Sequence, residues 1–290
     1  MLIICIISST LINLLFSEAK KRECLGYRII MVNYAVIVAI TTVLLAFGGK
    51  PSGTFSISSL AGDPQFWNRD AIFTYAVVFA LLNGLMYYFN FVITQRSIEI
   101  CGPSMSTLAQ KLGVIIIPGC ISFLWGEKMT TLIMIGLISA AAAFVLLLEG
   151  KKELKGIVPI VFVFGGITEV AKKLYALKSD AGDRLFFNFI VFLVCLIFSA
   201  SATFIRQKNF KVEKKELLMG SLIGIANLIA SYTAISALST LPSNVVFPTI
   251  SGAVITLTAA FGTIFYGEKL SVRRITGMLL AVASLILINV

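Results

Sequence analysis

One acidic residue, Glu169, stands in an apolar stretch where a charged side chain is unfavourable. The apolar run Gly156–Thr168 has 13 residues, whereas a helix that crosses a bilayer core needs about 20 residues at roughly 1.5 Å each. A membrane span at this place must therefore continue through Glu169. Because a charge at that depth costs about 2.5 to 3.5 kcal/mol on insertion scales, its carboxylate is expected to be paired, neutralised or functional.

Two interpretations of Glu169 remain open on the sequence alone. Lys172 and Lys173 follow at i+3 and i+4, so an intrahelical ion pair would lower the insertion cost without any function. Both lysines also lie nearer the Leu177 end and could reach the interface by themselves. Glu169 is the one acidic residue of 14 that lies well inside an apolar stretch. We therefore expect it to carry a proton or to contact a substrate in a central cavity.

Lys111 is the basic residue that lies well inside an apolar stretch of the first half of the chain. It follows Pro103 by about two helical turns, so its side chain could extend along the helix to the interface. Alternatively, its ammonium group faces a water-filled cavity as the partner of Glu169 or of a substrate anion. We expect it to face the cavity.

Polar side chains also recur at helical spacing inside two apolar stretches. The first stretch contains Asn83, Tyr87, Asn90 and Thr94 at i, i+4, i+7 and i+11, and the second contains Asn227 and Ser231 at i, i+4. Such residues also join helices by hydrogen bonds worth about 0.6 kcal/mol each. A stripe of four with a matching pair in the other half predicts that these residues line a cavity.

The elements that hold these residues are predicted to be transmembrane helices. The 290-residue chain is 58% hydrophobic and 13% charged, about half the usual charged fraction of soluble domains, and its mean hydropathy is +0.96. Irregular or open-edged backbone is not stable in lipid, and no alternating pattern of a barrel is present. The apolar runs predict an all-α polytopic membrane protein with ten spans near residues 2–16, 29–48, 71–94, 104–125, 130–148, 156–177, 185–205, 217–238, 243–266 and 271–289.

Composition also excludes several kinds of site. The net charge of +10 comes from Lys and Arg in short connections, which indicates membrane topology rather than nucleic-acid binding. The chain has five cysteines, mostly inside spans, and no histidine, so neither a disulfide framework nor a metal centre is expected. No nucleophile has a base beside it, which argues against an enzyme, and we expect no cofactor.

The connections after odd-numbered spans hold 16 Lys and Arg residues, and those after even-numbered spans hold seven. Positively charged loops stay in the cytoplasm, so this bias predicts that both termini lie outside it.

An internal repeat relates the two halves of the chain. The segments WGEKMTTLIMIG (125–136) and YGEKLSVRRITG (266–277) share an aromatic residue, Gly-Glu-Lys and a second glycine, and each is followed by an apolar span. Pro103-Ser104 and Pro242-Ser243 open the preceding spans. We therefore predict two repeats, residues 1–150 and 151–290, of five spans each. Because five is odd, the second must be inverted, as in secondary transporters with a site between the repeats.

This ten-span arrangement with closing Gly-Glu-Lys segments resembles the drug/metabolite transporter superfamily and its EamA-like ten-helix members. The second half also resembles the small multidrug resistance proteins, in which a first helix carries an essential Ala-Glu-Val. Thr168-Glu169-Val170 is similar to that motif, and LPSNVVFPTISG is similar to the family's Pro, aromatic and Ser-Gly spacing. The resemblance implies cytoplasmic termini, contrary to the charge bias.

The departures from this pattern bear on the substrate. Phe247 stands where the small multidrug resistance proteins have tyrosine, and Ile250, before Ser251, stands where they have tryptophan. The aromatic surroundings suited to quaternary ammonium drugs are thus weakened. In the first repeat Lys111 takes the tryptophan position. These residues are expected to line the cavity.

Together these patterns predict a secondary active transporter in the bacterial inner membrane. It would couple protons to a small polar metabolite or organic cation by alternating access, with lipid as its surroundings and a monomer sufficient. A channel or a lipid-linked-sugar flippase subunit without proton coupling is the alternative.

Overall fold

The computed structural model describes residues 1–48, 53–61, 68–121, 130–148, 152–176, 183–241, 243–267 and 272–289. Within these ranges it contains ten α-helices and the short 3-10 helix η1 (Ile57–Ala61). The α-helices are α1 (Leu2–Lys21), α2 (Gly26–Gly48), α3 (Arg69–Cys101), α4 (Pro103–Ile121), α5 (Thr131–Leu148), α6 (Lys152–Ala176), α7 (Asp183–Gln207), α8 (Lys214–Leu238), α9 (Ser243–Tyr266) and α10 (Val272–Asn289). Each expected span overlaps one of these helices.

Six of the described helices, α1, α2, α3, α7, α8 and α9, are long and apolar enough to cross a membrane. Shorter apolar segments occur in α5, α6 and α10, at Thr131–Ala143, Gly156–Val170 and Ile275–Ser284. The chain is therefore an all-α polytopic membrane protein. Helix α6 continues without interruption from Lys152 through Glu169 to Ala176, as the short apolar run before Glu169 requires.

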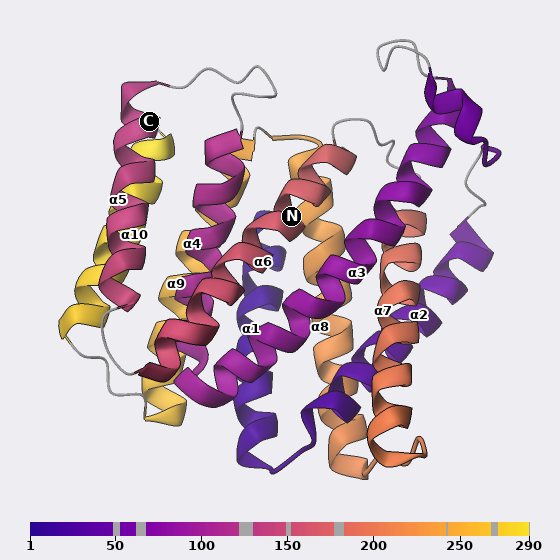
Figure 1. Ribbon diagram of the computed structural model, residues 1–290, viewed down its shortest axis with the longest axis horizontal. Coiled ribbons are helices and arrows are strands. Elements are labelled where there is room, and N and C mark those ends of the chain that lie inside the picture. The colour runs from indigo at the N-terminus through magenta and orange to yellow at the C-terminus, as the bar shows by residue number, and fades with distance from the viewer. Residues whose placement is uncertain are drawn as a thin grey trace.

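The helices run side by side across the molecule (Figure 1). Helices α5 and α10 pack together at one edge, and α2 packs against α7 toward the other. Between them, α1 contacts α8 and α9, whereas α6 contacts α3 and α4. The connections at residues 22–25 and 208–213 both lie at the lower edge of Figure 1.

Glycines bring α4 and α6 close together. A Cβ atom on Gly113 of α4 would collide with the carbonyl oxygen of Phe162 in α6, and one on Gly165 would lie 2.9 Å from the carbonyl oxygen of Gln110. Small residues of this kind allow helices to approach closely in membranes. The contact fixes the position of Lys111 relative to Glu169, because each charged residue lies within about one turn of these glycines.

A buried carboxylate joins three segments at the lower edge of the molecule. Glu216 is fully buried and accepts hydrogen bonds from the backbone amides of Leu25 (3.1 Å) and Glu213 (2.9 Å). Its second oxygen also accepts a bond from the Arg28 guanidinium at 3.0 Å. Glu216 thus completes a capping box at the start of α8 and ties it to the α1–α2 connection.

Candidate functional site

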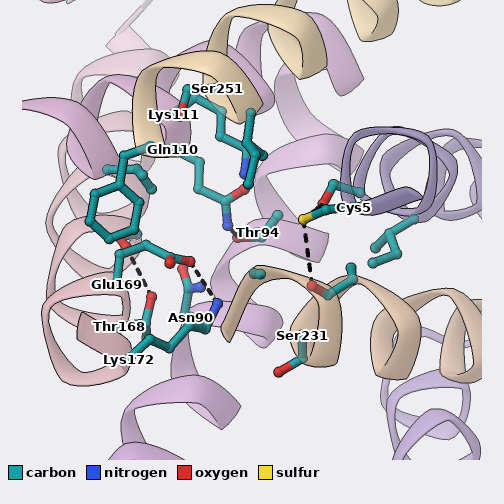
Figure 2. A pocket seen from close by; sticks show the side chains of 18 of the residues that line it. Cys5, Asn90, Thr94, Gln110, Lys111, Thr168, Glu169, Lys172, Ser231 and Ser251 are labelled. Atoms are coloured by element: carbon teal, nitrogen blue, oxygen red, sulfur yellow. Dashed lines mark hydrogen bonds and ion pairs between the residues drawn. The ribbon is translucent and has the colours of Figure 1, made fainter. Parts of the chain in front are cut away.

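A cavity of about 90 Å³ lies among α1, α3, α4, α6, α8 and α9 (Figure 2). This volume is several times the roughly 10–15 Å³ that one water needs, so the cavity can hold a small polar molecule. Its charged residues are Lys111, Glu169 and Lys172, and its uncharged polar residues include Ser9, Asn13, Asn90, Thr94, Gln110, Thr168, Asn227, Ser231 and Ser251. The outer surface of the helices is apolar by contrast, with Ile3, Phe47 and Ile205 largely exposed.

Ten of the eleven residues singled out in the sequence line this cavity. They are Tyr87, Asn90, Thr94, Lys111, Glu169, Asn227, Ser231, Phe247, Ile250 and Ser251. Asn83 does not line it. Although Asn83 belongs to the same stripe of α3 and is buried, it lies one turn before Tyr87, where the lining of the cavity on α3 ends.

Glu169 forms an ion pair within its own helix. The ammonium group of Lys172 donates to Oε1 of Glu169 at 2.7 Å, and the two side chains are 9% and 15% exposed, respectively. The Lys172 ammonium also lies over the Tyr87 ring, 5.3 Å from its centroid. Lys172 therefore points into the cavity and does not extend to the interface as the sequence allowed. The side chain of Lys173 lies outside the described residues.

Lys111 lines the cavity from α4, on the side of Figure 2 away from Glu169 and Lys172. Among the described residues no hydrogen-bond acceptor or carboxylate pairs with its ammonium group. The direct ion pair of Glu169 is with Lys172, and Lys111 interacts with this carboxylate only through longer-range electrostatic attraction. The side chain lies in the cavity rather than along the path to the interface.

Two buried polar atoms on the cavity wall also lack a hydrogen-bond partner in the described part of the chain. They are Oδ1 of Asn90 and Oγ of Ser251, in residues that are 7% and 1% exposed. Thr94, one turn after Asn90 in α3, instead accepts a bond from Nε2 of Gln110 at 3.0 Å. Buried polar groups are normally bonded, so these two atoms suit a bound molecule or water.

The wall formed by α8 is held by bonds to neighbouring helices. The hydroxyl of Tyr87 donates to Oδ1 of Asn227 at 2.7 Å, and the amide of Asn227 donates to Oδ1 of Asn33 at 3.3 Å. Ser231 donates to Oδ1 of Asn188 at 2.6 Å. These two α8 side chains therefore both line the cavity and join helices.

Sequence reasoning missed the contribution of α1. Cys5, Ser9 and Asn13 line the cavity at spacings of four residues. The same criterion that selected the stripe on α3 would have found them. Gln110, Thr168 and Lys172 were also missed as lining residues.

The first Gly-Glu-Lys segment and the Glu-Lys of the second lie outside the described residues.

An all-helical membrane fold with a charged cavity between its helices is compatible with membrane transport. Residues 155–290 match the family model described as "EamA-like transporter family", a family of the drug/metabolite transporter superfamily. The predicted resemblance to this superfamily is confirmed. The match indicates a membrane transporter of small molecules.

Similarity of fold extends beyond the matched segment. A solved structure described only as "Crystal structure of protein" has a TM-score of 0.60 and 16% sequence identity, covering 98% of this chain and 97% of that chain. No curated protein matches the sequence.

Proposed function

We propose that this protein is a proton-coupled secondary transporter that moves a small polar molecule by alternating access between two inverted repeats. The pairing of the helices supports the repeats, residues 1–150 and 151–290. If α1 corresponds to α6 and α4 to α9, then the α1–α9 contact corresponds to the α6–α4 contact, and the α1–α8 contact to the α6–α3 contact. Each repeat contributes three corresponding helices to the cavity, and one chain is then sufficient to enclose the substrate.

The observation that carries the proposal is the Glu169 carboxylate in the wall of this cavity. It is mostly buried, and its charge is balanced by Lys172 at 2.7 Å. When a proton binds Glu169, the carboxylate charge is lost and Lys172 keeps its charge without compensation. Proton uptake thus changes the net charge of the cavity at the point where the repeats meet. A change of this kind can favour one access state over the other.

The same ion pair also supports the alternative of a channel or flippase without proton coupling. A carboxylate that remains paired with Lys172 throughout would be structural, and the cavity would then be a passive path. Coupled proton movement distinguishes the two functions.

We propose the bacterial inner membrane as the location of the transporter, following the superfamily resemblance.

The test is proton movement into liposomes that contain the purified protein and a pH-sensitive dye. Addition of a transported metabolite should evoke proton movement in the native protein. Glu169→Gln should abolish it, because the amide keeps the shape of the side chain and cannot take up the proton. Glu169→Asp should retain it with a displaced pH optimum, since the shorter carboxylate still titrates.

Glu18→Gln is the matched control. Glu18 also forms a helical ion pair at 2.7 Å, with Arg22, but this pair lies at the protein surface outside the cavity. The control should transport like the native protein. Undiminished coupled proton movement by a folded Glu169→Gln protein would refute the proposal.

A further inference from the structure

We propose that the substrate carries an anionic group, specifically a carboxylate, which binds Lys111, and that protonation of Glu169 strengthens this binding. The inference rests on the proposed function, because it assigns a substrate class to the same cavity. It differs from the expectation for an organic cation, which would compete with the proton for the carboxylate.

The first argument is the charge of the cavity. Of the described residues that line it, Lys111 comes from α4, and Glu169 and Lys172 come from α6. The other titratable side chains that face it are the thiol of Cys5 from α1 and the phenol of Tyr87 from α3, and its α8 and α9 residues are uncharged. Two ammonium groups and one carboxylate leave one positive charge. A monoanionic ligand would neutralise it, whereas a cation would add a second charge.

The second argument is the partner that Lys111 lacks. Lys172 is paired directly with Glu169, but Lys111 forms no ion pair or hydrogen bond with the described residues and feels Glu169 only at longer range. An ammonium group within the membrane is normally paired or faces a water-filled path. A carboxylate on the substrate would supply this partner and form a charge-assisted hydrogen bond.

The third argument concerns the groups beside that carboxylate. Oδ1 of Asn90 can only accept a hydrogen bond, whereas the Ser251 hydroxyl can donate or accept. A hydroxyl or amino group on the substrate would donate to Asn90, and Ser251 would contribute a bond to the carboxylate. Together with a volume of about 90 Å³, these atoms fit a small hydroxy- or amino-carboxylate better than a bulky lipophilic drug.

The same charges determine whether a proton and the substrate favour or oppose each other's binding. With Glu169 ionised the cavity carries one positive charge, and with Glu169 protonated it carries two. A protonated cavity therefore attracts an anion more strongly. By thermodynamic linkage, the bound anion favours proton uptake by the same factor. Proton and substrate would then bind together and move in the same direction.

The experiment measures binding to the purified full-length protein by calorimetry. The probes are lactate, lactamide and 1-amino-2-propanol, which share one carbon skeleton and carry a carboxylate, an amide and an ammonium group. Other small hydroxy- and amino-carboxylates and inorganic phosphate complete the set. At least one carboxylate should bind, and the matched amide and amine should bind about tenfold or more weakly, as expected for loss of one charge-assisted contact.

Variants assign the contact and the coupling. Lys111→Met should abolish carboxylate binding and Lys111→Arg should retain part of it, while Lys211→Met, which removes an exposed lysine, should bind normally. Lowering the pH should tighten binding in the native protein. Glu169→Gln should bind tightly at every pH, because its amide imitates the protonated state.

Several results would overturn the inference: no carboxylate binds, the amine or phosphate binds more tightly than every carboxylate, or Lys111→Met binds like the native protein. These failures differ from failure of the proposed function. An amine whose transport moves protons through Glu169 would refute the substrate class and leave proton coupling intact. Carboxylate binding at Lys111 without proton movement would refute proton coupling and leave the substrate class intact.

Discussion

The ion pair between Glu169 and Lys172 should have a measurable coupling energy that disappears when Glu169 is protonated. A distance of 2.7 Å corresponds to about 6 kcal/mol of gross attraction at an effective dielectric constant of about 20. Desolvation offsets most of it, since the two side chains are only 15% and 9% exposed. Contacting residues usually retain about 0.5–3 kcal/mol of net coupling. We expect a value in the upper half of that range at neutral pH.

The perturbation is a double-mutant cycle of Glu169→Gln, Lys172→Met and the combined variant. Glu169→Gln alone should lower the free energy of unfolding by about 1–3 kcal/mol, less than for a dry ion pair, because Lys172 keeps the Tyr87 ring and access to the polar cavity. Glu18→Gln should lower it by about 0.2–1 kcal/mol, as expected for an exposed pair.

The assay is reversible unfolding of purified protein in mixed micelles, followed by circular dichroism over a range of pH. In a proton-coupled transporter the coupling energy should decrease as the pH is lowered through the range in which transport operates. A coupling energy that stays constant across that range would refute a titrating Glu169 and favour a purely structural pair. A coupling energy near zero at every pH would show that the pair contributes nothing to stability.

Three further predictions concern the scaffold. Glu216→Gln should lower the free energy of unfolding by about 1.5–3 kcal/mol in the same assay. The reason is that one amide oxygen cannot replace two carboxylate oxygens that both accept hydrogen bonds. An unchanged free energy of unfolding would contradict the buried network. Gly113→Ala should destabilise the protein by about 1–3 kcal/mol through collision with α6, whereas Gly156→Ala, which has open space around it, should not. A C-terminal reporter that is active only outside the cytoplasm should be active if the loop charges set the orientation, and activity of a cytoplasm-only reporter would contradict this.

The helices could be predicted from the sequence because apolar runs of membrane length have few alternative structures. The expected boundaries fail mainly where a helix extends beyond its apolar run. Helix α3 reaches Cys101, seven residues past the expected end at Thr94. Its last turns are polar, and they end where Gly102 adopts a positive φ of 83° before the proline that begins α4. Hydropathy marks the apolar run and does not record such an extension.

The cavity lining could be predicted in large part because helical spacing places Tyr87, Asn90 and Thr94 on one face of a helix. The partners of the charges could not be predicted in this way. The sequence allows Lys172 to reach the interface, yet its contacts with the Tyr87 ring and with Glu169 hold it inside. Periodicity gives the face of one helix, but the choice among acceptors depends on which helices pack together.

The two repeats proposed here differ at one position in a way that would orient the substrate. Lys111 and Ile250 each lie eight residues after the proline near the start of their helix, and both line the cavity. An exact repeat would give the cavity two equivalent walls. Here α4 presents an ammonium group, whereas α9 presents Ile250 and Phe247. A carboxylate would therefore point toward α4 and the apolar part of the substrate toward α9, so a single orientation would be favoured although the proposed repeats would relate the surrounding helices by pseudo-symmetry.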